Sequence, residues 1–213
     1  MIGKSLLLSS IENEQISEII TLVRNPTNIA HPKVTEIVHD DFYNLSDYRE
    51  LLTRLDAAFY CLGISAAGLS EKQYKEITYD LTISIARELQ NLNPGITICY
   101  ISGAGTDSSE KGKTMWARIK GRTENALISM HGNNAYMFRP GYIQPMKGVK
   151  SKTWWYNALY LVFAPLYPVF KLFLGKYVLT SVELSKAMLV TAKTGYRQRI
   201  LEISDIKSQA QKQ

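Results

Sequence analysis

Short β-branched runs alternate with longer stretches of helical periodicity along the chain after its first helix. This alternation is typical of βαβ units that surround a parallel sheet. The chain has 213 residues, 46% of them apolar, which suits one α/β domain with a modest appended region. We therefore predict an α/β fold with a doubly wound parallel sheet. Six strands are expected, at 18–24, 34–41, 56–63, 96–105, 134–141 and 199–204.

Helix start and stop signals fill the intervals between these runs. Ser70 with Gln73 forms a capping-box pattern, and Thr180 with Glu183 repeats it. In such a box the first side chain and the fourth each satisfy a backbone amide of the other, which predicts a helix start. Gly195 predicts the end of the last of these helices, because glycine readily adopts the left-handed conformation of a helix stop.

A further helix is expected in the interval 44–55, with Asn44 or Ser46 as its cap. Side chains three and four positions apart share one face of a helix. The apolar face of this helix would carry Tyr48, Leu51, Leu52 and Leu55.

The chain carries a formal charge of +6, and much of the excess lies in the range 111–152. A phosphate-bearing cofactor, an acidic substrate or an anionic membrane surface would each be attracted. Nucleic acid is disfavoured, because the lysines lie outside any recognisable recognition helix or RNA-binding aromatic motif.

The two cysteines, Cys61 and Cys99, lie in apolar strand-like runs without the spacing of a metal or redox motif. This pattern indicates buried, reduced thiols in a cytoplasmic protein. The first fifteen residues show no secretory signal, because they lack a long apolar core followed by a small-residue cleavage site. His31, His39 and His131 lie far apart in sequence, and no zinc site is expected from them.

The first residues, Met-Ile-Gly-Lys-Ser, form a weak glycine motif that Arg24 strengthens. Arg24 ends the first expected strand 21 residues after Gly3, where a dinucleotide-binding fold recognises the ribose 2′ position. An acidic residue there would favour NAD, whereas arginine offers a fork of donors to a 2′-phosphate. We predict NADP as the cofactor, with NAD as the alternative. A solvated arginine at a strand end is the simpler interpretation.

Six further segments carry a family resemblance. The chain resembles the atypical short-chain dehydrogenases, the NmrA-like and Tat-interacting-protein-like group often labelled nucleoside-diphosphate-sugar epimerases. The resemblance runs from Gly3 to about Pro145 and resumes near Val178. It implies a Rossmann-like NAD(P)-binding domain at 1–145. Residues 146–213 would form an apolar substrate or cover region, followed by a helix and a strand that complete the same domain. The segments are TLVRNP at 21–26, HDDF at 39–42, FYCLGIS at 59–65, YISGAGTDSS at 100–109, WARIKGRTEN at 116–125 and MFRPGYI at 137–143.

The resemblance also implies roles for single residues. Gly3 is similar to the last glycine of the family's phosphate-binding turn, and Arg24 to its 2′-phosphate contact. Ser102 resembles the active-site serine and Lys120 the ribose-binding lysine. The remaining cofactor contacts would be Asp41 and Phe42 beside the adenine, Leu62 and Gly63 along the cofactor, and the RPG segment with Pro140 near the nicotinamide.

The family's first strand and its first two motif glycines would precede Gly3. In the usual strand order that strand is central. We therefore expect an N-terminally truncated Rossmann-like sheet in which two strand edges lack partners, with the natural protein starting about 10–20 residues upstream.

The family's catalytic tyrosine lies four residues before its lysine, and here that residue is Trp116. An indole N–H can donate a hydrogen bond but does not exchange a proton near neutral pH. Two functional interpretations follow. In the first, which we favour, Tyr100, Tyr142 or Lys113 supplies the proton and a reductase or isomerase activity survives. In the second, the protein binds NADP without catalysis, as a regulatory or assembly protein. A structural role for Trp116 in the helix core is the third interpretation.

The most apolar segment, 154–174, falls where the family places its variable substrate region. Pro165 and Pro168 interrupt it and favour two short helices over one membrane span. A cover over the cleft of a small-molecule substrate or the face of a homodimer is the first interpretation. Two tryptophans and flanking lysines make a peripheral membrane contact the alternative.

Overall fold

The computed structural model describes residues 1–146 and 178–212, so the expectations for 154–174 lie outside the described residues. None of the described helices is long and apolar enough to cross a membrane.

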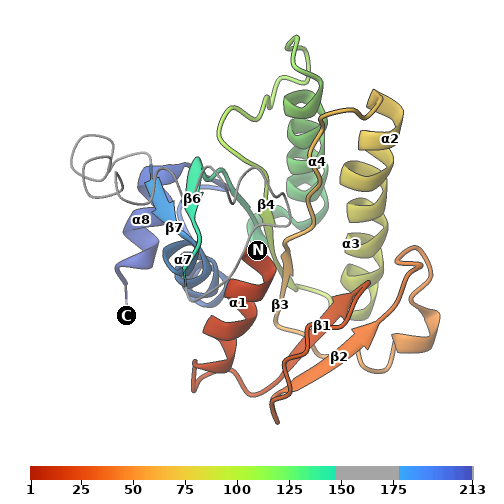
Figure 1. Ribbon diagram of the computed structural model, residues 1–213, viewed down its shortest axis with the longest axis vertical. Helices are drawn as coiled ribbons and strands as arrows, with labels where there is room; N and C mark the ends of the chain where they lie inside the picture. Colours follow the sequence, from red (N-terminus) through yellow and green to blue (C-terminus); the bar gives the residue numbers. More distant parts are fainter. Residues whose placement is uncertain (147–177, 213) are drawn as a thin grey trace.

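Figure 1 shows the arrangement of the helices and strands. The elements are α1 (Ile2–Ile11), β1 (Ile19–Val23), β2 (Val34–Val38), a 3₁₀ turn (Ser46–Tyr48), β3 (Ala57–Tyr60), α2 (Glu71–Lys75), a π-helix (Glu76–Asp80), α3 (Leu81–Leu92), β4 (Thr97–Ile101), α4 (Met115–His131), a 3₁₀ turn (Gly132–Asn134), β5 (Ala135–Phe138), β6 (Tyr142–Gln144), β7 (Val178–Thr180), α7 (Ser181–Thr194), β8 (Ile200–Leu201) and α8 (Ile203–Ala210).

All strand pairs are parallel, which confirms the predicted α/β architecture. Four strands form the main sheet in the order β3-β4-β5-β8, while β1 pairs with β2 and β6 with β7. The six expected strands are all present, each shorter than predicted. The short β6 and β7 were not predicted.

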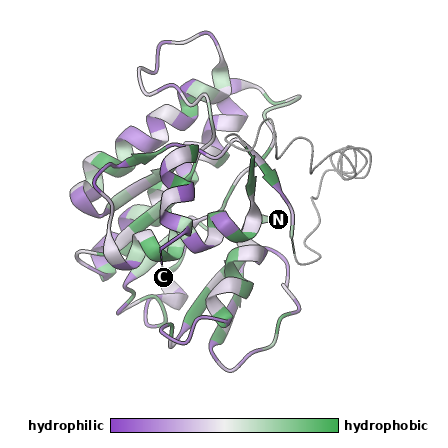
Figure 2. Ribbon diagram, turned by 90° about the vertical axis from the view of Figure 1, so that its left-hand side faces the viewer, coloured by the Kyte–Doolittle hydropathy of each residue, from purple (hydrophilic) through white to green (hydrophobic). Residues whose placement is uncertain are grey.

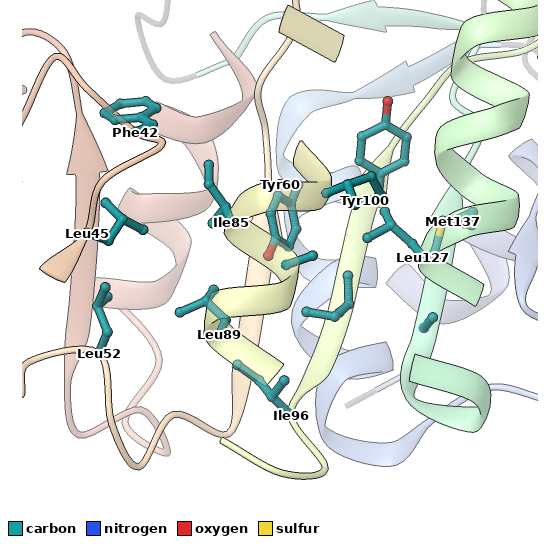
Figure 3. Packing of buried hydrophobic residues seen from close by; sticks show 14 of the residues in the cluster. Phe42, Leu45, Leu52, Tyr60, Ile85, Leu89, Ile96, Tyr100, Leu127 and Met137 are labelled. Carbon is teal, nitrogen blue, oxygen red and sulfur yellow. The ribbon is translucent and has the colours of Figure 1, made fainter. Parts of the chain in front are cut away.

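Helices cover both faces of the main sheet. On one face, α3 and α4 pack against a cluster that includes Ile85, Leu89 and Leu127, together with Tyr60 and Tyr100 from the strands. Figure 3 shows these side chains in one continuous layer. On the other face, α1, α7 and α8 pack around a second cluster. Hydrophilic and hydrophobic residues alternate along the helices (Figure 2). The order of layers is helix, sheet, helix.

The sheet is interrupted between β1 and β3. Among the described strands β1 pairs only with β2, and β3 only with β4. Figure 1 nevertheless shows β1 lying between β2 and β3. Ile20 and Leu22 of β1 contact the same apolar cluster as Tyr60 of β3. Within residues 1–146 and 178–212, β1 and β3 each have one edge without a strand partner, as expected.

Both predicted capping boxes form. The Ser70 and Gln73 side chains bond each other's backbone at the start of α2, and Thr180 and Glu183 do the same at the start of α7. Gly195 ends α7 with a φ of 69°. The π-helix between α2 and α3 was not predicted.

The helix expected at 44–55 is wrong, because only the 3₁₀ turn Ser46–Tyr48 forms. The backbone N–H and the hydroxyl of Ser46 both donate to Asn44 Oδ1, at 3.2 and 2.8 Å. Such local bonds compete with helical ones. Leu51 is 44% exposed, so the expected apolar stripe does not lie on one buried face.

Candidate functional site

The carboxyl end of β3 lies beside the start of α1. A Cβ atom placed on Gly3 would lie 3.4 Å from the Cβ of Cys61, which follows β3 directly. The first turn of α1 contains no acidic residue and its cap makes no side-chain hydrogen bond. The positive end of the helix dipole is therefore available at this edge of the sheet, where a phosphate would be stabilised.

Arg24 follows the last residue of β1 and is exposed. Its guanidinium has no hydrogen-bond or ion-pair partner among residues 1–146 and 178–212. His39, which follows β2, donates its backbone N–H to Val23 O at 2.8 Å, so Asp41 follows the adjacent strand at the same edge. The structure thus places Arg24 and Asp41 at the carboxyl ends of two paired strands.

Asp41 and Phe42 differ in accessibility. Asp41 is exposed and accepts a hydrogen bond from the backbone N–H of Tyr43 at 3.1 Å. Phe42 is only 5% exposed and belongs to the same core cluster as Leu45 and Ile83. A cavity of about 580 Å³ lies between the segment 42–49 and one side of the π-helix and α3. Asp41 is therefore the member of this pair that solvent reaches.

Leu62 and Gly63 extend beyond the end of β3. Leu62 is partly buried against the core cluster on the α3 side. Gly63 is exposed, and a Cβ atom placed on it would have no heavy atom within 4 Å. The backbone at Gly63 therefore borders open space at the same edge as the start of α1.

Ser102 and Lys120 meet at the carboxyl end of β4. Ser102 is 7% exposed, and its hydroxyl donates to Phe138 O at 3.1 Å. Lys120 Nζ donates to Ser102 O at 2.5 Å and lies 3.4 Å from Ile101 O. Burial lowers the pKa of Lys120 to about 8, and the carboxylate of Glu124 partly offsets this effect. Lys120 is thus a cation whose proton can be lost near neutral pH.

Trp116 lies one helical turn before Lys120 on α4. Its ring lies over the loop that follows β4, since a Cβ atom placed on Gly105 would be 3.7 Å from Trp116 Cη2. Its indole N–H has no hydrogen-bond partner in the described part of the chain. Trp116 is therefore a half-buried aromatic side chain with one unused hydrogen-bond donor, at the position where the resemblance leads us to expect a tyrosine.

The RPG segment is attached to the loop after β4. Pro140 O accepts a hydrogen bond from the backbone N–H of Ala104 at 2.8 Å. Arg139 forms two hydrogen bonds with the fully buried carboxylate of Glu124, and its Nη2 also lies 2.5 Å from Ser108 Oγ. This ion pair connects β5, α4 and the loop 103–114.

Sequence reasoning missed the contact that seats this loop. A Cβ atom placed on Gly121 of α4 would lie 1.8 Å from the backbone oxygen of Asp107. The Asp107 carboxylate accepts hydrogen bonds from Ser109 and, at 2.7 Å, from the backbone N–H of Gly112. These hydrogen bonds lower the pKa of Asp107, and the bond from the Ser109 hydroxyl has the largest effect. A glycine in mid-helix is the signal that could have revealed this close approach.

The three alternative proton donors lie in different surroundings. Tyr100 is 1% exposed, and burial raises the pKa of its phenol. Tyr142 is exposed on β6 and donates its hydroxyl proton to Gln144 Oε1 at 2.9 Å. Lys113 is exposed in the loop before α4. Unlike Tyr100, Tyr142 and Lys113, Lys120 has a hydrogen bond to Ser102 in the structure.

No protein-family model matches the sequence, and no curated protein matches it significantly. Solved structures do match the fold. The ADP-L-glycero-D-manno-heptose-6-epimerase of Helicobacter pylori is 13% identical, with a TM-score of 0.65 over 98% of this chain and 77% of that one. A short-chain dehydrogenase family protein of Francisella tularensis is 12% identical, with a TM-score of 0.64 over 96% of this chain and 93% of that one.

A third similar structure is MoeE5 in complex with UDP-glucuronic acid and NAD, which is 12% identical with a TM-score of 0.62 over 95% of this chain and 72% of that one. The chain spans 66% of another match, gox2253. At these identities the likeness concerns the fold alone. The chain has the Rossmann-like α/β fold that short-chain dehydrogenases and nucleotide-sugar epimerases share.

Proposed function

We propose that the carboxyl edge of the sheet binds a nicotinamide dinucleotide, with NADP preferred, and that the protein is an oxidoreductase or epimerase-like enzyme acting on a small organic substrate. The observation that carries the proposal is the convergence of the start of α1, Arg24, Gly63 and the Ser102–Lys120 pair at the carboxyl ends of β1, β3 and β4. In open α/β sheets, ligands bind at this edge.

The residues present fit such a cofactor. The uncapped first turn of α1 offers amides to the pyrophosphate, and the unpartnered Arg24 offers a guanidinium to a 2′-phosphate. Gly63 leaves room for close approach of the cofactor to the backbone. When bound, the nicotinamide supplies or accepts a hydride.

Lys120 is the group that we propose to move the proton. Its Nζ has three hydrogens, two of which are directed to backbone carbonyl oxygens of Ile101 and Ser102, and the third is left for a substrate oxygen. In reduction, Nζ would donate its proton to the oxygen of a carbonyl group as hydride reaches the carbon. Since the pKa of Lys120 is about 8, the donating form is lost as the pH rises through 8.

The cofactor assignment is tested by titrating the chain with NADPH and NADH and following nicotinamide fluorescence. Arg24→Ala should weaken NADPH binding about tenfold to a hundredfold, because a hydrogen bond to a charged group contributes about 1.5–3 kcal/mol, and should leave NADH binding unchanged. Arg197→Ala is the matched control, because this exposed arginine precedes β8 at the opposite edge. Equal affinities of wild type and Arg24→Ala for NADPH would contradict the assignment.

The role of Lys120 is tested by following NADPH oxidation with a panel of small aldehydes and ketones between pH 6 and pH 10. Turnover by wild type should fall above pH 8, and Lys120→Arg, which keeps the charge but holds its proton, should lose turnover at every pH. Lys72→Arg, at an exposed lysine of α2, is the control. Turnover that persists unchanged in Lys120→Arg would contradict the role of Lys120.

A non-catalytic NADP-binding protein is the second candidate, and Trp116 favours it, because indole cannot replace a phenol in proton transfer. NADPH binding without turnover on any substrate of the panel would support this candidate. Turnover that is lost in Lys120→Ala would exclude it.

A further inference from the structure

The cavity of about 580 Å³ between the segment 42–49 and α3 lies on the flank of the sheet. Because α3 leads into β4, its last turns lie near the amino edge of the sheet, opposite the proposed cofactor site. The cavity reaches Arg87 and Asn91 in these turns. Of the residues proposed to contact the cofactor, only Phe42 lines it. The cavity therefore extends away from the carboxyl edge.

The lining of the cavity combines a buried apolar part with aromatic and polar side chains. Phe42, Leu45 and Ile83 are each at most 5% exposed and belong to the core, and Figure 3 shows Phe42 and Leu45 beside α3. The exposed Tyr43 and the partly buried Tyr79 add two aromatic rings. Amide and hydroxyl groups complete the lining, from Asn44, Ser46, Ser84 and Asn91. Such a lining suits a ligand that has both C–H faces and hydroxyl groups.

Three of the four charged side chains in the lining are already paired. Arg49 Nε lies 2.6 Å from Glu88 Oε1, and Asp80 Oδ1 lies 2.6 Å from Lys75 Nζ. The fourth, Arg87, is exposed and has no hydrogen-bond or ion-pair partner in the described part of the chain. A guanidinium group binds phosphate through two parallel hydrogen bonds. The cavity thus has one cation left for an anionic group.

Polar groups follow one another along the wall that α3 and the π-helix form. Asp80, Ser84, Arg87 and Asn91 are three or four positions apart, so they share one face. At 1.5 Å per residue, Asp80 and Arg87 lie about 10 Å apart along the helix axis. An anionic group and a set of hydroxyl groups on one small molecule could therefore meet Arg87 and Asp80 together.

The π-helix forms the end of this wall. Its last two residues, Tyr79 and Asp80, line the cavity. On the other side of the cavity, the Tyr43 hydroxyl donates to Glu76 O of the π-helix at 3.1 Å, which ties the segment 42–49 to this wall. Single π-turns within helices occur frequently at functional sites. The irregular backbone thus lies where the cavity is closed.

We propose that this cavity is a second ligand site, which binds a phosphorylated monosaccharide. Arg87 binds the phosphate, while the carboxylate of Asp80 accepts hydrogen bonds from sugar hydroxyls and Ser84 donates to them. The ring of Tyr79 contacts the C–H face of the sugar. Because the site lies away from the carboxyl edge, the sugar phosphate and the dinucleotide can be bound at the same time.

The test measures binding of glucose 6-phosphate, fructose 6-phosphate and ribose 5-phosphate to the 213-residue chain by calorimetry. Glucose and inorganic phosphate are the comparison probes. Each titration is run without cofactor, so that its outcome is independent of the proposed function, and is then repeated with saturating NADPH. At least one sugar phosphate should bind about tenfold or more tightly than either comparison probe, with the same affinity in the presence of NADPH.

Arg87→Ala should weaken binding of that sugar phosphate about tenfold to a hundredfold, because it removes the hydrogen bonds to the charged group. Arg197→Ala is the matched control, because this exposed arginine precedes β8 at the far side of the main sheet. Amide exchange should slow at 44–49 and 84–91 when the sugar phosphate is bound.

Four outcomes would overturn the proposal. They are no binding by any of the three sugar phosphates, equal affinity for inorganic phosphate, equal affinity of wild type and Arg87→Ala, and displacement of the sugar phosphate by NADPH. The last outcome would assign the cavity to the cofactor site.

Discussion

The two parts of the sheet differ in how firmly they are held. In β4 and β5, eight of the nine residues are buried, and each strand is paired on both sides, whereas every residue of β1 is only partly buried and the strand is paired on one side. The candidate site takes residues from both parts. Ser102, Lys120 and Pro140 belong to the well-packed part, and Arg24 and Asp41 belong to the β1–β2 pair. The residues proposed for the chemistry thus lie on the well-packed part, while the arginine proposed to bind the 2′-phosphate follows a strand that is paired on one side and only partly buried.

The largest effect is expected from the ion pair in the well-packed part. Arg139→Met leaves the buried Glu124 carboxylate without its partner, which should lower the free energy of unfolding by about 3–5 kcal/mol in a urea titration. The matched control is Arg49→Met, which breaks the ion pair of Arg49, a side chain 60% exposed, with Glu88, and should cost far less, because exposed ion pairs contribute little to stability. Equal losses would show that the Arg139–Glu124 pair is no better buried than a surface pair.

Core truncations compare the two parts directly. Met137 of β5 is fully buried, whereas Leu22 of β1 is partly buried. Met137→Ala should cost about 2–5 kcal/mol of unfolding free energy, and Leu22→Ala about 1 kcal/mol, because the latter removes less buried surface. Thermal or urea unfolding measures both. A cost for Leu22→Ala as large as that for Met137→Ala would show that β1 is packed as tightly as β5.

Gly121 tests how closely the loop 103–114 lies on α4. Gly121→Ala should destabilise the protein by about 1–3 kcal/mol, because the new methyl group would overlap the backbone of Asp107. The same change at Gly63 enters open space and should leave the unfolding free energy nearly unchanged. A stable Gly121→Ala protein would mean that the loop is not seated on the helix.

The smallest effect is a gain in stability at the interruption. Thr21→Val removes a buried hydroxyl without a partner and should raise the unfolding free energy by about 1 kcal/mol or less. Thr123→Val is the comparison, because its hydroxyl donates to Ile119 O at 2.8 Å and its loss should be destabilising. Destabilisation by Thr21→Val would indicate that the hydroxyl has a partner in solution.

The strands could be predicted because buried parallel strands read as β-branched apolar runs, and the capped helices because a capping box is a local interaction between residues three apart. The helix at 44–55 was wrong because Asn44 and Ser46 bond each other instead of capping a helix. The π-helix at Glu76–Asp80 depends on contacts distant in sequence, such as the Tyr43 hydroxyl that donates to Glu76 O at 3.1 Å, and no local pattern announces it.

The candidate site could be predicted only in part, for a similar reason. The positions of Gly3, Arg24, Ser102 and Lys120 follow from the order of strands and turns. Whether a side chain is accessible depends on packing: Phe42 is in the core, and the Ser102 hydroxyl is bonded to Phe138 O. The seating of Asp107 on Gly121 also joins residues of a loop and a helix that no short motif links.

Amide exchange of the chain with and without saturating NADPH tests whether the cofactor binds at the carboxyl edge of the sheet. We predict slower exchange at the first turn of α1 and at the residues that follow β1, β3 and β4, namely 24–25, 62–63 and 102–105. Unchanged exchange at these positions, or protection confined to the cavity between 42–49 and α3, would contradict binding at this edge.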